Sequence, residues 1–350
     1  MVTCLMHHDD AVCGAAVNIE RGQALPRHLP SSSINAPSSA TLLHPMRTRA
    51  VFLIIVVGLV GAGCAPAVRD PSPSAAGANP PLQGVPSPPP GALIVTAAGD
   101  ICQATPESCD PTARLVRRIH PDVALTLGDN QYDEGTLAQY RASYDHSWGT
   151  FKDITHPVAG NHEWKTPNAR GYLDYFGRHA YWYSFMVGHW RLYALDGTCS
   201  DNGGCGVGDP QYTWLKQKLA ARSDRCILAY WHQPRFSSGI DHGSDTDVAP
   251  LWDLLYGAGA DLILNGHEHN YERFALQDPA GHPATDGIVE IVAGTGGNGD
   301  GSYPFGDPIT SSEVRLNGLG VVELSLWAHG WVERFLRPGM HVVDHASGNC

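Results

Sequence analysis

Five short apolar runs, each ending in a small group of polar residues, constrain the fold of this chain more than any other feature of its sequence. The runs are rich in Val, Ile, Leu and Ala, which is typical of strands buried on both faces of a sheet. In chain order they are LIVTAAGD, DVALTLGDNQY, HPVAGNHE, CILAYWHQP and DLILNGHEH. The polar residues at their ends are Asp100, Asp129, Tyr132, Asn161, His162, His232, His267 and His269.

Stretches with helix-like patterns lie between or beside these runs, at residues 111–120, 136–144, 210–221 and 247–256. Strands that alternate with helices predict an α/β layered domain in which the loops after the strands form one site. Further strands are expected at residues 181–195 (a hairpin turning at Gly188), 288–293, 320–326 and 330–336. Residues 92–350 show no second change of composition and are predicted to form one domain.

The residue types at the strand ends suit metal ions. Carboxylate, imidazole and amide groups together favour hard-to-borderline cations such as Fe, Zn or Mn. Two such ions about 3.5–4 Å apart can clamp a phosphoryl group and activate a water for in-line attack. Asp129 is the natural bridging ligand, since one carboxylate can give an oxygen to each ion. His267 and His269 are separated by one residue, which allows one histidine to bind each ion.

Five motifs carry a resemblance to a known family. GDIC at residues 99–102, GDNQY at 128–132, GNHE at 160–163, YWH at 230–232 and GHEH at 266–269 resemble, in this order, the five blocks of calcineurin-like metallophosphoesterases. The tyrosine of GDNQY and the YER after GHEH are similar to purple acid phosphatases and their bacterial relatives. The resemblance implies a four-layer αββα sandwich, with two mixed sheets flanked by helices. It also implies a metal-dependent phosphoric ester hydrolase of the acid- or alkaline-phosphatase type.

The resemblance assigns the strand-end residues to two divalent or trivalent metal ions, Fe together with Zn, Mn or a second Fe. The first ion would be bound by Asp100, Asp129, Tyr132 and His269. The second ion would be bound by Asp129, Asn161, His232 and His267. A tyrosinate favours Fe(III) at the first position. If Tyr132 only packs beneath its loop, the first ion lacks a ligand.

Three further residues are candidates for contact with substrate, beside the metal ligand Asn161. His162 would donate to a phosphate oxygen or protonate the leaving group, and His242 is the alternative for the second role. Arg235 would hold a phosphate oxygen in a bidentate contact. Residues 294–302, GTGGNGDGS, fit either an ordinary flexible turn or a loop whose bare backbone lets substrate approach the metals. A P-loop is excluded there because no Gly-Lys-Ser/Thr follows.

Cys102 departs from the pattern of many family members, which have a metal-binding histidine two residues after the first aspartate. It is either a thiolate ligand or half of a disulfide. Residues 92–350 hold six cysteines, an even number that suggests three disulfides in an exported domain. The short spacings favour the pairs Cys102–Cys109 and Cys199–Cys205, which would leave Cys226 to pair with Cys350, although six cysteines allow fifteen pairings.

Residues 46–64, MRTRAVFLIIVVGLVGAGC, have the layout of a signal peptide, with two arginines, an apolar run and small residues before Cys64. The segment resembles a bacterial lipoprotein signal, which is cleaved before a lipidated cysteine. An uncleaved anchor and plain secretion are the alternatives. A lipoprotein would be anchored on the cell surface or periplasmic side. Residues 1–45 carry no motif and are interpreted as a spurious or disordered leader. Residues 65–91, with nine prolines, are interpreted as a disordered linker.

Charge argues against one class of partner. Residues 1–91 contain five of the 23 Lys and Arg and four of the 35 Asp and Glu, which leaves 18 basic and 31 acidic residues, a formal charge of −13, for residues 92–350. Such a surface argues against a nucleic-acid groove. Membrane contact is expected only through the lipid anchor, and the oligomeric state stays open.

The expected substrate is a small phosphate ester. The leading hypothesis is hydrolysis of phosphomonoesters by attack of a metal-bound hydroxide. A phosphodiesterase acting on cyclic nucleotides, phospholipid head groups or cell-wall polymers is the alternative within this class. A non-catalytic metal-binding surface protein is the alternative outside it.

Overall fold

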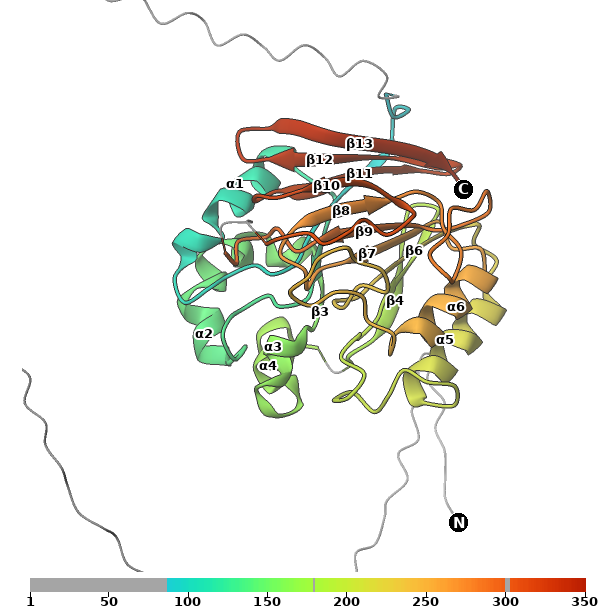
Figure 1. Ribbon diagram of the computed structural model, residues 1–350. Coiled ribbons are helices and arrows are strands. Elements are labelled where there is room, and N and C mark those ends of the chain that lie inside the picture. The colour runs from blue at the N-terminus through green and yellow to red at the C-terminus, as the bar shows by residue number, and fades with distance from the viewer. Residues whose placement is uncertain (1–86, 179, 300–302) are drawn as a thin grey trace, which may run out of the picture. The chain divides into compact units, whose positions relative to one another are not determined.

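The computed structural model describes residues 87–178, 180–299 and 303–350 (Figure 1). The predicted leader at residues 1–45, the signal segment at 46–64 and residues 65–86 of the linker lie outside this part of the chain. Two mixed sheets pack face to face with helices on their outer faces, so the predicted αββα sandwich is confirmed. None of the helices in the described part is long and apolar enough to cross a lipid bilayer.

The first sheet has the strand order β13-β12-β11-β1-β2-β3. Its strands are β1 Leu93–Ala98, β2 Val123–Leu127, β3 Thr155–Val158, β11 Val321–Trp327, β12 Gly330–Arg337 and β13 His341–Asn349. β1, β2 and β3 run parallel to one another, whereas β11, β12 and β13 join them as an antiparallel extension. Side chains alternate between the faces of a strand, and Val95 and Ala97 of β1 accordingly join the core between the two sheets.

The second sheet has the strand order β10-β8-β9-β7-β6-β5-β4. Its strands are β4 Tyr183–Val187, β5 Trp190–Ala194, β6 Cys226–Tyr230, β7 Leu262–Asn265, β8 Tyr271–Phe274, β9 Val289–Ala293 and β10 Ser312–Leu316. β5, β6, β7 and β9 run parallel. The predicted hairpin at residues 181–195 is β4 and β5, and it turns at Gly188 with φ +57°.

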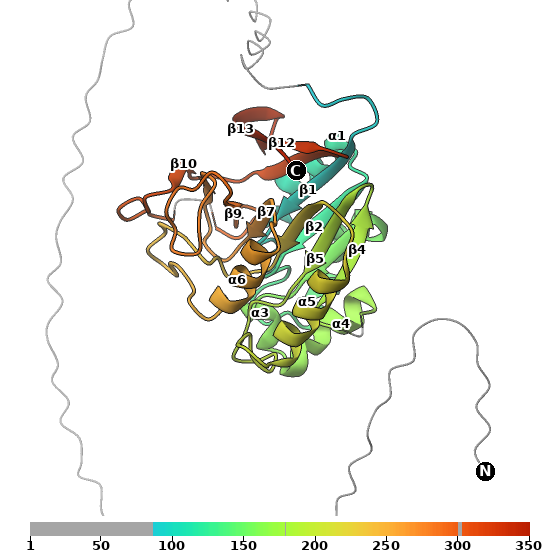
Figure 2. The same ribbon diagram turned by 90° about the vertical axis from the view of Figure 1, so that its right-hand side faces the viewer.

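Helices cover the outer face of each sheet. They are α1 Asp110–Ile119, α2 Leu137–Ala142, α3 Asn161–Trp164, α4 Arg170–Phe176, α5 Pro210–Ala221 and α6 Ala249–Gly257. α1, α2 and α4 share a core with the first sheet, and α5 and α6 share one with the second. Figure 2 shows α5 and α6 side by side over the second sheet. The core between the sheets includes Trp190, Trp331 and Phe335.

Most predicted elements are present, and the differences have local causes. The helix predicted at residues 210–221 is α5. The helix predicted at residues 136–144 ends at Ala142, because the N–H of Tyr144 donates to Oε1 of Gln131 over 3.0 Å and not to the helix. The helix predicted at residues 247–256 begins at Ala249, after a turn in which Asp247 N–H donates to Asp245 Oδ1. α3, α4, β8, β10 and β13 were not predicted from the sequence.

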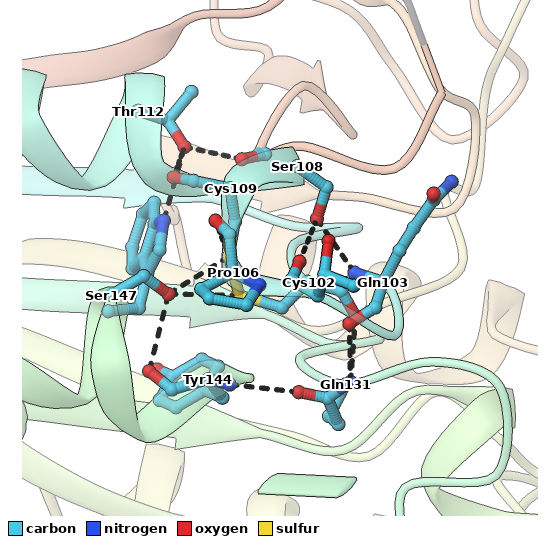
Figure 3. Close-up of a disulfide and its surroundings, with 12 residues drawn as sticks. Cys102, Gln103, Pro106, Ser108, Cys109, Thr112, Gln131, Tyr144 and Ser147 are labelled. Atoms are coloured by element: carbon cyan, nitrogen blue, oxygen red, sulfur yellow. Dashed lines mark hydrogen bonds between the residues drawn. A yellow bond between two sulfur atoms is a disulfide. The ribbon is translucent and has the colours of Figure 1, made fainter. Parts of the chain in front are cut away.

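All three predicted disulfides are present. Cys102–Cys109, Cys199–Cys205 and Cys226–Cys350 have S–S distances of 2.03, 1.99 and 1.92 Å. Figure 3 shows the first of them just before α1, with Ser147 beside its sulfur atoms. Because the sulfur of Cys102 is bonded to that of Cys109, the alternative in which Cys102 is a thiolate metal ligand is wrong.

Candidate metal centre

The predicted ligands lie where the carboxyl ends of parallel strands from both sheets meet. β1, β2 and β3 of the first sheet and β6 and β7 of the second all end at this edge. The loops that follow these strands carry Asp100, Asp129, Tyr132, Asn161, His232, His267 and His269. Two sheets thus contribute to one site, which is why its ligands are spread over 170 residues of sequence, from Asp100 to His269.

The phenol oxygen of Tyr132 lies at the centre of a first ligand group. It is 2.8 Å from Oδ1 of Asp100, 3.0 Å from Oδ2 of Asp129 and 3.3 Å from Nε2 of His269. Ligand atoms bound about 2.0–2.2 Å from one metal ion lie about 3 Å from one another. The Tyr132 oxygen is therefore at ligand-to-ligand spacing from three other candidate ligands.

A second group adjoins the first. Nε2 of His232 is 3.3 Å from Oδ2 of Asp129 and 3.1 Å from Nδ1 of His267. The ligand atoms of Asp129, His232 and His267 all lie within 4.8 Å of one another. Oδ1 of Asn161 is buried and has no hydrogen-bond partner in the described structure. Burying a polar atom without a partner is costly, and binding a metal ion would satisfy this oxygen.

Asp129 belongs to both groups through one atom. Its Oδ2 contacts Tyr132 on one side and His232 on the other. Its Oδ1 instead accepts a 2.8 Å hydrogen bond from the backbone N–H of His162. The carboxylate is thereby fixed so that Oδ2 alone faces both ligand groups.

Three of the ligand residues have strained backbones. Asp100, Asp129 and His267 have φ angles of +58°, +47° and +73°, in the left-handed region that residues other than glycine seldom adopt. Such conformations persist where the surroundings impose them, and they cluster at functional sites. Here the left-handed conformation turns the chain sharply after each strand. The turn keeps the side chain of the candidate ligand at the edge of the sheet.

The electrostatics of the cluster place negative charge at its centre. Burial opposes ionisation of Asp100, but His269 and His232 outweigh burial and lower the pKa of its carboxyl. Burial also opposes ionisation of Asp129, whose pKa is nevertheless lowered, chiefly by His232. The pKa of His232 is raised to about 10, because the Asp129 and Asp100 carboxylates outweigh the effect of burial.

The phenol of Tyr132 responds in the opposite direction. Burial, followed by the charges of Asp100 and Asp129, raises its pKa well above the ordinary value. The neutral phenol donates a hydrogen bond to Asp100, and the imidazolium of His232 carries positive charge that offsets part of the charge of the two buried carboxylates. Metal binding releases such protons, and a cation among these groups would reverse both shifts. The donor set therefore fits a pair of metal ions.

Glycines at the start of residues 294–302 lie close to the loop that carries Asp100. A Cβ on Gly294 would lie 2.6 Å from Asp100 Oδ2, and one on Gly296 would lie 2.5 Å from the carbonyl oxygen of Gly99. These glycines allow their own loop to pack tightly against the loop that carries Asp100. Residues 300–302 lie outside the described part of the chain.

His162, the predicted substrate contact, lies at the edge of the cluster. Its Nε2 is 3.9 Å from Oδ2 of Asp129, and its Nδ1 is 2.7 Å from the carbonyl oxygen of Asp133. Nζ of Lys165 is 2.9 Å from the same Nδ1. Lys165 was missed in the sequence, where a single lysine three residues after His162 has no distinguishing pattern.

His242 also reaches the cluster, whereas Arg235 is directed elsewhere. The exposed His242 ring stacks on the ring of His267, with centroids 4.2 Å apart. The guanidinium of Arg235 lies over the ring of Phe236 at 4.4 Å. Phe236 in turn packs on Trp252 of α6. The structure therefore does not bring Arg235 to the ligands, and Lys165 is the cation beside His162.

Glu163 and Gln131, two residues of the recognised motifs, form hydrogen bonds with the backbone of the loops that carry the candidate ligands. Glu163, the last residue of GNHE, accepts hydrogen bonds from the backbone N–H groups of Gln131 and Gly160. The side-chain amide of Gln131 donates to the carbonyl oxygens of Cys102 and Tyr132 (Figure 3 shows Gln131 near Cys102). The GDIC and GDNQY loops are thereby joined, although nothing in the sequence pattern distinguishes Gln131 from an exposed glutamine.

Comparison with known proteins agrees with this geometry. The family model of calcineurin-like phosphoesterases matches residues 93–271. Purple acid phosphatase 18 of Arabidopsis thaliana is 28% identical over 276 residues, which cover 68% of this chain and 58% of that protein. Purple acid phosphatase 15 of the same plant is 29% identical over 293 residues, which cover 67% of this chain and 52% of that protein. The chain thus spans little more than half the length of these relatives.

Solved structures share the fold. The purple acid phosphatase PPD1 from yellow lupin seeds superposes with a TM-score of 0.63 at 18% identity, covering 75% of this chain and 55% of that one. GAP50, described as the anchor in the inner membrane complex of Plasmodium, superposes with a TM-score of 0.55 at 20% identity. The match covers 73% of this chain and 88% of that one. Because the family model covers half of the sequence and the ligand groups lie in the matching loops, the chain belongs to the calcineurin-like phosphoesterase family, with purple acid phosphatases among its relatives.

Proposed function

We propose that this chain is an exported phosphoesterase that hydrolyses phosphomonoesters at a pair of metal ions. The observation that carries the proposal is the position of Asp129 Oδ2, which faces the ligand group around Tyr132 and the group around His232. A single structural ion would need one such group, whereas two groups sharing an oxygen suit two adjacent ions. Two-metal centres are typical of phosphoester hydrolysis.

Each ligand group would hold one ion. When bound, the ions would lower the pKa of a coordinated water and screen the charge of the phosphoryl group. The first would be held by Asp100, Asp129, Tyr132 and His269. The second would be held by Asp129, Asn161, His232 and His267. The phenol of Tyr132 favours Fe(III) in the first position, and Zn, Mn or Fe would suit the second.

His162 and Lys165 would act on the phosphate ester itself. The His162 side chain is 19% exposed, so it can face both the ligand cluster and an entering substrate. We assign it the proton that the leaving oxygen takes up, because its Nε2 is the ring nitrogen nearer to the cluster. Lys165 would neutralise a phosphate oxygen, the role that the sequence suggested for Arg235.

Export is part of the proposal. Disulfides persist in oxidising compartments and are rare in the cytosol, and three are formed here. We propose that the signal at residues 46–64 directs the domain out of the cytoplasm and that Cys64 carries a lipid anchor. Globomycin, which blocks lipoprotein signal cleavage, should then increase the mass of the membrane-bound protein. A Cys64→Ser variant that stays lipid-modified would disprove the anchor.

The function is tested on protein of measured metal content, with nitrophenyl phosphate compared with bis-nitrophenyl phosphate. A phosphomonoesterase has the higher kcat/KM on the first ester. A higher kcat/KM on the second would favour the phosphodiesterase alternative. Metal-loaded protein that turns over neither ester would favour a non-catalytic metal-binding role.

A further inference from the structure

Three buried glutamates accept hydrogen bonds from the loop at residues 235–243 and hold its backbone in place. Glu290 accepts hydrogen bonds from the backbone N–H groups of Arg235 and Phe236. Glu272 accepts from the N–H and hydroxyl of Ser238. Glu268, the middle residue of GHEH, accepts from the N–H groups of residues 242 and 243 over 2.8 and 2.5 Å. All three carboxylates are inaccessible to solvent.

The same loop also pairs with the backbone of residues 304–306. The N–H of Ile240 donates to the carbonyl oxygen of Pro304, and the N–H of Gly306 donates to that of Ser238. A β-bridge pairs residue 239 with Phe305. A Cβ on Gly306 would lie 2.8 Å from Cγ2 of Ile240, so the two segments are packed closely. The loop therefore has one backbone conformation imposed by contacts along its whole length.

This fixed loop presents an apolar side chain to solvent close in the chain to His242, which reaches the ligand cluster. Ile240 is 61% exposed, and it lies two residues before His242, whose ring stacks on His267. On the neighbouring segment, the ring of Tyr303 contacts the ring of His269 at 4.3 Å. Single exposed apolar residues are common on proteins. Ile240 differs from such residues because its loop carries His242, which stacks on His267, and is hydrogen-bonded to the segment that carries Tyr303, which contacts His269.

We propose that Ile240, with Tyr303 and Phe305, forms a subsite for the leaving group of the phosphate ester and selects esters of uncharged aryl or apolar alkyl alcohols. The proposal rests on the proposed function. The phosphoryl group would lie at the ligand cluster, and the alcohol would extend over Ile240. Asp241 is exposed on the same loop, and its carboxylate would repel leaving groups that carry a second phosphate or a carboxylate.

The test compares naphthyl phosphate with glycerol phosphate on metal-loaded protein, in the natural chain and in Ile240→Thr. Threonine keeps the β-branched shape but replaces the two-carbon ethyl arm with a hydroxyl. Burial of a methylene is worth about fourfold in binding. We expect kcat/KM for naphthyl phosphate to fall about four- to tenfold and that for glycerol phosphate to stay within twofold. Val343→Thr, at an exposed apolar residue of β13, is the matched control and should change neither.

Equal losses on both esters would overturn the subsite, because they would indicate a general effect on the loop. A natural chain that does not prefer naphthyl phosphate would also overturn it. If no ester is hydrolysed, the proposed function fails, and calorimetric binding of phenylphosphonate and methylphosphonate decides the subsite independently. Tighter binding of phenylphosphonate that Ile240→Thr abolishes would support the subsite, and equal binding of the two would disprove it.

Discussion

The phenol of Tyr132 donates a 2.8 Å hydrogen bond to Oδ1 of Asp100, and the ring is held there by a loop that Gln131 joins to the GDIC segment. This contact places the phenol oxygen among ligand atoms and not beneath the loop, which was the alternative suggested by the sequence. This position is the one that a metal-binding Tyr132 requires.

The first prediction concerns colour. An unperturbed phenol has a pKa of about 10, and Fe(III) is a strong enough Lewis acid to keep Tyr132 ionised near neutrality. Iron-loaded protein should show a visible charge-transfer band that Tyr132→Phe abolishes. Tyr303→Phe, which leaves a ring against His269, should keep the band. Active, iron-loaded natural protein without colour would contradict the assignment.

The second prediction concerns metal content. Asp129 Oδ2 faces both ligand groups, so Asp129→Ala should lose both ions, whereas Asp174→Ala on the surface of α4 should keep about two. Elemental analysis of the purified proteins measures this directly. One fully retained ion in Asp129→Ala would show that the two groups do not share this carboxylate.

The third prediction separates the two candidate acids. His162→Ala should keep both metals and lose turnover by about 10²–10⁴-fold, the usual contribution of a general acid or base. His189→Ala, in the exposed turn between β4 and β5, is the control. A loss smaller than about threefold in His162→Ala, with a large loss in His242→Ala, would transfer the role to His242.

The fourth prediction concerns the pH dependence of stability. Burial and the charge of Asp344 raise the pKa of Glu333 to about 8, whereas an unfolded glutamate has a pKa of about 4.3. The folded state then binds the proton more tightly, so this contribution to stability is present at low pH and is lost as the pH rises toward 8.

Glu333→Gln mimics the protonated carboxyl and should flatten the curve. Between about pH 5 and about pH 8 its free energy of unfolding should fall by ~4 kcal/mol less than that of the natural chain. Denaturant titrations at several pH values measure this difference. The exposed Glu134→Gln should leave the slope unchanged. Parallel curves for the natural chain and Glu333→Gln would show that Glu333 ionises normally.

Apolar patterning was sufficient to find the strands that carry the ligands. The runs ending at Asp100, Asp129, Asn161, His232 and His267 are all strands of the observed sheets. Patterning did not find β8, because its central residues are Glu272 and Arg273, which are buried with charged or hydroxyl partners in place of apolar neighbours. Periodicity detects burial in an apolar core and gives no signal when a strand buries satisfied polar groups.

The support of the site was unpredictable for the same reason. Glu268, Glu272 and Glu290 look like ordinary glutamates in the sequence, yet each is buried against backbone N–H groups of one loop. Most of these loop contacts come from backbone N–H groups, which carry no sequence signature. The conformation of the loop that presents His242 could therefore be found only from the structure.

The Cys226–Cys350 disulfide encloses a segment with a sequence separation of 124, and that segment contains His232, His267 and His269. Everything between the two cysteines belongs to one covalent ring. A single proteolytic cut within the ring would leave both products joined, so a nicked molecule would keep its three histidine ligands on one covalent body. Such a protein would run as one band without reductant and as two with it.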